Sequence, residues 1–441
     1  MERRIYCLPI VESHLDPDPM TTIDSPRERP RVAIIYHFFA HYRAAVVEEL
    51  ARSEAADYDF FADTCDYEGS IKTAEFSPAV RFHRCRVRQL RGPIMWQRGL
   101  IGLALSRRFD TMIFLAGPYW PATWLSAMLA RLAGKRVFFW GHGWNSPPRG
   151  FTGVVRNAFY RLAHQMLLYG HDGKQLGLAQ GWRPNRLHVI FNSLDVKAQD
   201  AALAALPTDS VDATRRRLFG SSDRPVVICT TRLVPHRRLD LLIEALKLLA
   251  DQGVHANLLI VGDGPERHAL ERQAKALGVS AVFTGAVYAE RDLAPLITCA
   301  NVMAAPGKIG LAAMHALAYG VPIVTHDDPD DQMPEYEAAI PGLTGGSFRR
   351  GDAKDLARAL RPWLAQARPP QAVQQACRQV IDRFYNPWFQ RAAIDRAVLG
   401  READDIFWLR EGVPRPAEAD GESQRTAPFG AVASRAGGDR P

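Results

Sequence analysis

The stretch from residue 226 to residue 264 reads VVICTTRLVPHRRLDLLIEALKLLADQGVHANLLIVGDG and decides the fold class. It contains an apolar run at 226–231, a segment with helical spacing, and a second apolar run at 256–264. The apolar stripe of the helical segment consists of Leu242, Ala245, Leu246 and Leu249. Continuous apolar runs that alternate with such helices are typical of parallel strands buried on both faces of a sheet. The stretch therefore predicts a strand–helix–strand unit of an α/β domain.

The same alternation continues in both directions along the chain, and it restarts after a polar stretch at 199–224. Further strand-like runs lie at 31–38, 58–63, 111–117, 136–143, 165–170 and 187–193, and at 281–287, 301–307 and 321–327. The sequence predicts an α/β protein of two doubly wound, Rossmann-like domains that face each other across a cleft. The expected divisions are a disordered segment at 1–29, a first domain at 30–200, a linker at 201–224, a second domain at 225–375, terminal helices at 376–411 that pack back on the first domain, and a disordered tail at 412–441.

Composition agrees with a globular, two-domain protein. The chain has 441 residues, of which 47% are hydrophobic and 23% are charged. Its six cysteines form no C-x-x-C pair, which predicts a reducing, cytoplasmic compartment and no structural zinc site. The N-terminus lacks the apolar core of a secretory signal. The uncharged stretch at 111–130 is long enough to span a membrane, but two prolines and a glycine interrupt it. We therefore favour a strand followed by a helix.

The formal net charge of +7 is concentrated in the stretch at 81–108, where arginines are interleaved with Trp96, Leu100 and Ile101. One interpretation is a solvated face on which arginine stems cover apolar surface. The other is a peripheral contact with anionic lipid heads, or with a phosphate-bearing acceptor. No recognition motif for nucleic acid accompanies the charge, so we expect no nucleic-acid partner.

Two loops that follow strands carry groups suited to an anion. Gly262 and Gly264 form a strand–helix turn that exposes backbone amides, although a tight turn alone also explains them. Arg232 and Arg237 follow the strand-like run at 226–231, and two guanidinium groups at that edge can clamp a diphosphate. Ordinary surface arginines are the alternative.

Four segments in this order and spacing resemble one enzyme family: TRLVPHRRLDLLIEALKLL, LLIVGDGPERHAL, VFTGAV and GLAAMHALAYGVPIVTHD. They resemble the C-terminal domain of the retaining group-one nucleotide-sugar glycosyltransferases, which have the glycosyltransferase-B fold. The resemblance is strong over residues 226–366, and the segments HYR (41–43), WGHG (140–143) and FNSLD (191–195) match more loosely. It implies that the first domain is the acceptor side and that the second binds the nucleotide sugar.

The resemblance also implies roles for individual residues. Arg232 and Arg237 match residues that hold the donor diphosphate, and His142 matches a histidine at the sugar end of the cleft; these three are the predicted catalytic residues. Val287 matches a position whose backbone faces the nucleobase, and the helix from about Gly310 matches one whose N-terminus faces the phosphates. The full predicted donor-binding set is Gly262, Gly264, Val287, Gly307, Lys308, Ile309, Gly310, Leu311, His315 and Glu335. No cofactor is expected, since the nucleotide sugar is a substrate.

The chain departs from the family at two positions. The family has two glutamates eight residues apart, and they align with Gly307 and His315. A neutral imidazole can still bind a ribose hydroxyl, although a histidine satisfied within the core is the alternative for His315. Gly307 offers only backbone, so Lys308 is the candidate for a polar head at that position. These losses leave the identity of the sugar open and put catalysis itself in question.

The family's proposed reaction needs no carboxylate nucleophile. Retaining glycosidases use two carboxylates about 5 Å apart, whereas front-face attack lets the departing diphosphate accept the proton of the acceptor. Arginines and a helix N-terminus then stabilise the leaving group. Asp328 and Asp330 form a D-x-D that could hold magnesium, but we favour a solvated or hydroxyl-binding loop and expect no metal. For Glu335, a contact to sugar hydroxyls and a helix cap are both open.

On the acceptor side, His41 and Arg43 follow the first strand, where the family often has a glycine-rich loop. Arg43 either faces an acceptor phosphate or is an ordinary residue at the start of a helix. The predicted function is transfer of a sugar, with retention, from a nucleotide diphosphate donor to a glycan or lipid-linked acceptor in cell-surface polysaccharide synthesis. A partner subunit of low activity that binds nucleotide or glycan, and a sugar-nucleotide epimerase of the same fold, are the alternatives.

Overall fold

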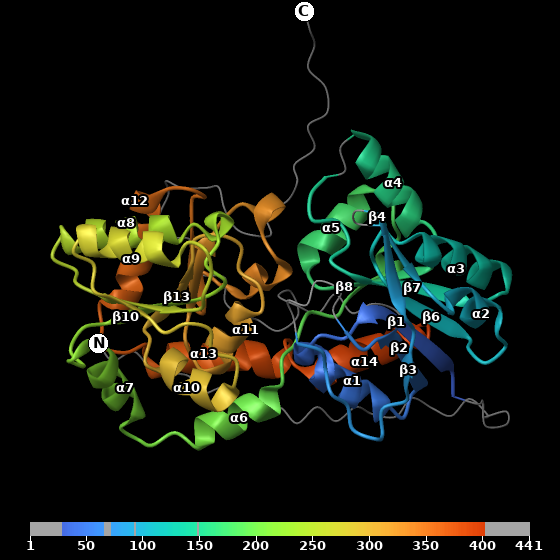
Figure 1. Cartoon of the computed structure of the whole chain (residues 1–441), viewed down its shortest axis with the longest axis horizontal. Helices are drawn as coiled ribbons and strands as arrows, with labels where there is room; N and C mark the ends of the chain where they lie inside the picture. Colours follow the sequence, from blue (N-terminus) through green and yellow to red (C-terminus); the bar gives the residue numbers. More distant parts are fainter. Residues whose placement is uncertain (1–28, 66–71, 92–93, 148–149, 402–441) are drawn as a thin grey trace, which may run out of the picture.

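The computed structural model describes residues 29–65, 72–91, 94–147 and 150–401. They form two α/β domains side by side, each built on a mostly parallel sheet (Figure 1). The predicted fold class is therefore confirmed. The predicted disordered segments at 1–29 and 412–441 lie outside the described residues, apart from Arg29.

The N-terminal domain has a seven-stranded parallel sheet in the order β3-β2-β1-β6-β7-β8-β9. Helices lie on both sides of the sheet, and an antiparallel ribbon of β4 and β5 is added at its margin. The strands are β1 (Arg31–Phe38), β2 (Asp57–Asp63), β3 (Phe82–Arg84), β4 (Val87–Arg91), β5 (Ile94–Gln97), β6 (Thr111–Leu115), β7 (Arg136–Gly141), β8 (Gln165–Leu168) and β9 (Leu187–Val189). The helices are α1 (Ala44–Ala51), α2 (Leu100–Leu105), α3 (Pro121–Leu132), α4 (Gly150–Tyr160) and α5 (His171–Ala179), with 3-10 turns η1 (His41–Arg43) and η2 (Pro184–Arg186).

The C-terminal domain has a six-stranded parallel sheet in the order β12-β11-β10-β13-β14-β15. Its strands are β10 (Val226–Thr230), β11 (Asn257–Val261), β12 (Ala281–Phe283), β13 (Val302–Ala305), β14 (Ile323–His326) and β15 (Gly345–Phe348). Its helices are α8 (Leu239–Ala250), α9 (Arg267–Ala276), α10 (Glu290–Thr298), α11 (Ala312–Ala318) and α12 (Ala353–Leu360), with 3-10 turns η3 (Pro235–Arg237), η4 (Pro329–Asp331), η5 (Pro334–Ala338) and η6 (Arg361–Leu364). In each sheet the strand order reverses after the third strand, which places a crevice at the carboxyl ends of the two central strands.

The apolar runs became strands because both faces of each sheet are covered. Val226, Val227 and Ile228 are fully buried, and successive residues belong to apolar clusters on opposite faces of the sheet. Strands without such runs were not predicted: β15 reads GGSF, and β3, β4 and β5 lie in the arginine-rich stretch. The stretch at 111–130 contains β6 and α3, a strand followed by a helix, as expected. Among the described residues no helix is long and apolar enough to cross a membrane.

The segment expected to join the domains, 201–224, is largely helical. It contains the end of α6 (Val196–Ala204) and all of α7 (Ser210–Phe219), and both helices contact α10. At the other end of the fold, α13 (Gln371–Arg383) packs on α11, and α14 (Pro387–Val398) crosses to the N-terminal domain. There Asp395 of α14 accepts hydrogen bonds from the hydroxyls of Ser53 (2.9 Å) and Tyr58 (2.6 Å).

Arg215 fixes α7 to the C-terminal domain from inside the protein. Its side chain is 1% exposed, and its guanidinium donates to the carbonyls of Cys299 and Ala367 and to Oδ1 of Asn301, each at 2.8 Å.

We expect Arg215→Met to lower the free energy of unfolding by roughly 3 kcal/mol, because buried acceptors lose their donors. The measurement is denaturant unfolding, with the exposed neighbour substituted in the same way (Arg216→Met) as the control. Equal stability of the two variants would contradict this role.

Candidate active site between the two sheets

The first part of the candidate site is a cavity of about 230 Å³ at the carboxyl ends of β10 and β13. These are the central strands where the order of the C-terminal sheet reverses. Two predicted catalytic residues, Arg232 and Arg237, line it; Arg232 is exposed and Arg237 is half-buried. Of the predicted donor-binding residues, those that line it are Gly307, Lys308, Ile309, Gly310 and Leu311. The structure thus brings together two guanidinium groups and a glycine-bearing loop, an arrangement suited to an anion.

Turn η3 and the loop at 306–308 are held in close contact. The amide of Gly307 donates to the carbonyl of Arg237 (3.1 Å), and Nη1 of Arg237 donates to the carbonyl of Lys308 (2.6 Å). A Cβ at position 307 would lie 2.6 Å from the carbonyl oxygen of His236 and 2.9 Å from Cα of Arg237. No side chain therefore fits at 307 in this arrangement, and a glutamate there would require η3 to move.

Gly262 and Gly264 serve the cavity without lining it. A Cβ at Gly262 would lie 1.8 Å from the carbonyl oxygen of Thr231, and one at Gly264 would lie 2.3 Å from that of Leu233. The two glycines let the segment that carries Arg232 run directly against the turn. The role of the two glycines in the structure is therefore to allow this close packing of backbone.

Three residues of the predicted donor set remain in this domain, Val287, His315 and Glu335, and none of them lines the cavity. Val287 is half-buried and packs on a core cluster. Nδ1 of His315 lies 3.4 Å from Oε1 of Glu290 and 3.2 Å from Nε2 of Gln199. Burial opposes ionisation of Glu290, but hydrogen bonds with His315 and Tyr319 lower its pKa overall. The sequence did not reveal Glu290 as the partner of His315.

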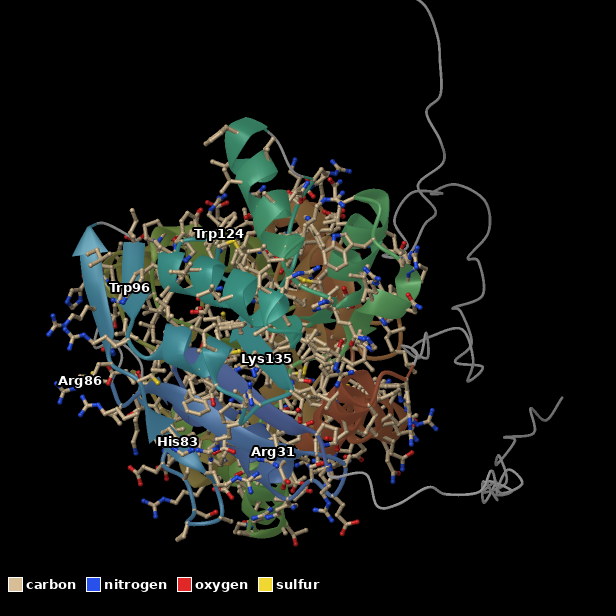
Figure 2. The ribbon with its side chains drawn as sticks, turned by 90° about the vertical axis from the view of Figure 1, so that its right-hand side faces the viewer. Arg31, His83, Arg86, Trp96, Trp124 and Lys135 are labelled. Atoms are coloured by element: carbon tan, nitrogen blue, oxygen red, sulfur yellow. The ribbon has the colours of Figure 1, made fainter. Side chains whose placement is uncertain are left out.

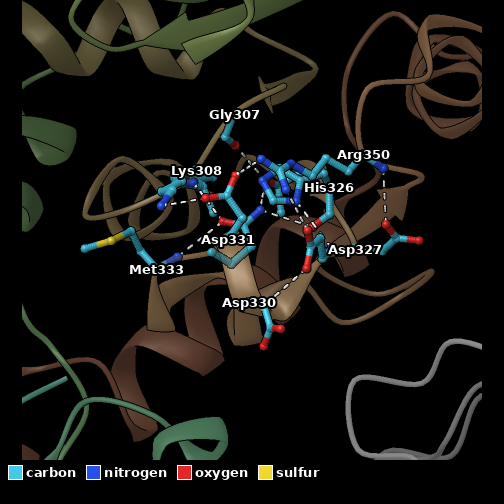
Figure 3. A network of polar contacts seen from close by, with 12 residues as sticks. Gly307, Lys308, His326, Asp327, Asp330, Asp331, Met333 and Arg350 are labelled. Carbon is cyan, nitrogen blue, oxygen red and sulfur yellow. Dashed lines mark hydrogen bonds and ion pairs between the residues drawn. The ribbon is translucent and has the colours of Figure 1, made fainter. Parts of the chain in front are cut away.

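The loop at 326–333 follows β14, and two of its aspartates, Asp328 and Asp331, are paired with cations (Figure 3). Nζ of Lys308 lies 2.6 Å from Oδ1 of Asp331, and Arg350 pairs with Asp331 (2.5 Å) and Asp328 (2.8 Å). Burial opposes ionisation of Asp331, but Lys308 and Arg350 lower its pKa. The described residues contain no group of three or more His, Cys, Asp and Glu side chains that could hold a metal ion. Asp328, half of the predicted D-x-D, is thus the partner of an arginine.

The second part of the candidate site is a cavity of about 360 Å³ in the N-terminal domain, beside the carboxyl ends of β1 and β6. Arg43 lines it, with its guanidinium over the rings of Trp140 (5.7 Å) and Tyr169 (4.9 Å) and hydrogen-bonded to the hydroxyl of Tyr169. Its Nη1 is buried without a hydrogen-bond partner. His41 is exposed, 3.3 Å from the carbonyl oxygen of Lys72, and does not line the cavity.

His142 lines the same cavity, close to Arg43. Burial and the positive charge of Arg43 lower the pKa of His142 to about 4, so the imidazole is neutral near pH 7. Its Nδ1 is buried without a hydrogen-bond partner, and its ring packs edge-on against Tyr169. A neutral imidazole with an unused nitrogen can bind a hydroxyl of a ligand.

Turn η5 of the C-terminal domain reaches across to the N-terminal domain. Glu335 is 1% exposed and accepts a hydrogen bond from Nδ2 of Asn192 (2.7 Å), while its second carboxylate oxygen has no partner. Burial raises the pKa of Glu335, and Asn192 and Arg43 partly oppose the shift. The predicted residues Arg43, His142 and Glu335 therefore meet in one region.

Glu337 forms the main polar contact between the domains. Its carboxylate accepts the amides of His171 and Asp172, both at 2.9 Å, at the N-terminus of α5. Tyr336 donates to the carboxylate of Asp172. The sequence analysis missed this contact, and the only signal was a second glutamate two residues after Glu335. The two oxygens of the Glu337 carboxyl group thus accept free amides at a helix N-terminus, and this contact joins the two domains.

We expect Gly307→Ala to destabilise the protein by about 1–3 kcal/mol, because the added Cβ collides with the backbone of η3. Gly310→Ala is a matched control in the same cavity, since its Cβ would meet nothing closer than 4.0 Å. Thermal unfolding of both variants checks the expectation. An equal loss of stability in the two variants would contradict the expectation.

The interdomain contact should weaken as the pH rises. Burial and the neighbouring Asp172 raise the pKa of Glu337 to about 8, so the folded protein keeps a proton that the unfolded chain releases above about pH 4.5. Stability from this group therefore falls between those values, by an amount on the order of 2 kcal/mol between pH 6 and 8.5.

Urea unfolding at pH 6 and 8.5 measures this dependence. Glu337→Gln should flatten it, whereas Glu54→Gln, at an exposed glutamate, should leave it unchanged. A profile for Glu337→Gln as steep as that of the wild type would show that the pH dependence arises elsewhere.

Comparison with known proteins identifies the family. The family model described as "Glycosyl transferases group 1" matches residues 210–380. A GDP-mannose-dependent alpha-(1-6)-phosphatidylinositol monomannoside mannosyltransferase of Mycolicibacterium smegmatis is 31% identical over 60% of this chain and 70% of its own length. A dimannoside mannosyltransferase of Mycobacterium tuberculosis is 44% identical over 43% of this chain, and the match spans about half (47%) of that relative.

Solved structures share the architecture at low sequence identity. A glycosyltransferase of Rickettsia africae superposes with a TM-score of 0.62 at 13% identity, over 84% of this chain and 99% of the other. HepE of Anabaena in complex with UDP superposes with a TM-score of 0.60 at 16% identity, over the same shares. The chain therefore belongs to the group 1 glycosyltransferases, with two Rossmann-like domains in the glycosyltransferase-B fold.

Proposed function

We propose that this glycosyltransferase transfers a sugar, with retention and without a metal ion, from a nucleotide diphosphate donor to a lipid-linked or glycan acceptor. The observation that carries the proposal is the pair Arg232 and Arg237 at the cavity where the C-terminal sheet reverses its strand order. GDP-mannose is the first donor to test and a phosphatidylinositol mannoside the first acceptor, because relatives at 31% and 44% identity carry these names. The acceptor class fits cell-surface glycan or glycolipid synthesis, at the cytoplasmic face of a membrane.

In this proposal the donor diphosphate lies in the cavity of the C-terminal domain. Arg232 and Arg237 meet its negative charge, with the backbone of Gly307 and Gly310 alongside. This charge increases as the bond to the sugar breaks, so preorganised guanidinium groups stabilise the transition state more than the ground state. Asp328 and Asp331 are already neutralised by Arg350 and Lys308, which favours metal-independent binding.

The acceptor lies in the cavity of the N-terminal domain. The unused Nη1 of Arg43 suits an acceptor phosphate, and the neutral His142 suits a sugar hydroxyl. Retention follows if the departing diphosphate takes the proton of the attacking hydroxyl on the face from which it leaves. The absence of carboxylates at Gly307 and His315 then lowers affinity or selectivity for the sugar rather than removing the nucleophile.

We expect Arg237→Ala and Arg232→Ala each to weaken donor binding roughly 10- to 100-fold, through loss of a charged hydrogen bond to phosphate. Arg272→Ala, at an exposed arginine of α9, is the control and should bind as the wild type does. Titration of GDP, UDP and GDP-mannose by thermal shift gives the affinities, since a ligand of the folded state raises the melting temperature. Donor affinity that is unchanged in both variants would refute the proposed site.

Product analysis separates the enzyme from its two alternatives. Two results together support the proposal. GDP is released only when the acceptor is present, and an α-linked product forms at a rate that a chelator does not change. Nucleotide binding without release favours a partner subunit of low activity, which the missing glutamates also suggest. An altered sugar nucleotide without an acceptor favours an epimerase.

A further inference from the structure

The ribbon of β4 and β5 presents an outward face with an ordered pattern. Its register pairs Arg88 with Trp96, and at its base the amide of Arg98 donates to the carbonyl of Arg86. From base to tip this face carries Arg86 and Arg98, then Arg88 beside Trp96. The register shifts between Gln89 and Arg91, so that Ile94 pairs with Arg91, and Leu90 and Ile94 are exposed near the tip. The opposite face is covered, since Met95 and Gln97 are buried.

Among the described residues, acidic side chains neutralise only part of the positive charge around this outward face. The stretch at 81–108 contains eight arginines and no Asp or Glu. Three of these arginines are paired with Asp59 or Asp63 on β2, namely Arg81, Arg84 and Arg108. Arg86, Arg88 and Arg98 are exposed, and no acidic side chain among the described residues pairs with them. Figure 2 shows Arg86 at the outer margin of the domain.

Two aliphatic side chains near the tip are open to solvent. Leu90 is 60% exposed and Ile94 is 41% exposed, although each is a residue that usually packs inside. Helix α3 contacts β5 of the ribbon. Trp96 is half-buried at the level between the tip and the arginines.

We propose that this outward face docks on the surface of an anionic lipid bilayer. Guanidinium groups bind lipid phosphates, an indole prefers the membrane–water interface, and aliphatic side chains enter the boundary of the acyl chains. The face carries these groups in that order towards its tip. A nucleic acid would also match the charge, but it would leave Leu90 and Ile94 exposed to water. The proposal concerns the location of the enzyme and does not depend on its donor or acceptor.

Vesicle flotation of the full chain tests the arginines. Vesicles with 30% phosphatidylglycerol in phosphatidylcholine should bind the wild type, and pure phosphatidylcholine should bind it far less. The variant R86Q/R88Q/R98Q should lower partitioning roughly 100-fold, at about fivefold for each arginine. The control R216Q/R217Q/R272Q removes the same charge from exposed positions of α7 and α9 and should float as the wild type does.

A second pair of variants tests the tip. L90S/I94S should lower partitioning roughly tenfold, whereas L203S/L399S, at leucines of 38% and 40% exposure, should not. Circular dichroism and the nucleotide-induced thermal shift should be unchanged in all variants. If nucleotide did not raise the melting temperature, that result would count against the donor site and not against the membrane face.

Several outcomes would overturn the proposal. One is equal flotation of R86Q/R88Q/R98Q and its control, and another is equal flotation on neutral and anionic vesicles. Retention on single-stranded DNA without flotation would assign the face to nucleic acid instead. Reduced flotation of both the arginine variant and the tip variant, with both controls intact, would support it.

Discussion

The two sheets face each other because turn η5 of one domain is buried against a helix N-terminus of the other. Glu337 accepts two amides at the start of α5, and beside it Glu335 is hydrogen-bonded to Asn192. A cavity in each sheet becomes useful for transfer between two substrates only when such a contact sets their relative position. Since the contact is made by buried carboxyl groups, its strength depends on their protonation.

The charges near the two cavities differ in kind. In the C-terminal domain, the arginines that line the cavity are exposed or half-buried, and the nearby carboxylates are neutralised by other cations. In the N-terminal domain, one guanidinium is enclosed by aromatic rings, and the adjacent imidazole is neutral. This division agrees with the proposal of a donor diphosphate in the first cavity and acceptor hydroxyls in the second.

The departures from the family have different physical causes. At position 307 the backbone of η3 approaches so closely that only glycine fits, and a glutamate there would require that turn to move. At position 315 the histidine lies against Glu290, so a carboxylate is still present in that region but on a different helix. Sequence comparison showed both losses, whereas the compensating neighbour and the steric reason needed coordinates.

The sequence by itself determined the α/β class, the two-domain division and most strands, because continuous apolar runs and helical stripes are local patterns. It also predicted Arg232, Arg237 and Gly307 at one edge of a sheet, because the carboxyl ends of parallel strands converge. Only the tertiary structure decided the contact of Glu337 with α5, the packing role of Gly262 and Gly264, and the pairing of Lys308 with Asp331. These depend on distances between segments far apart in the chain, and a side chain's partner there is set by packing, which no local pattern records.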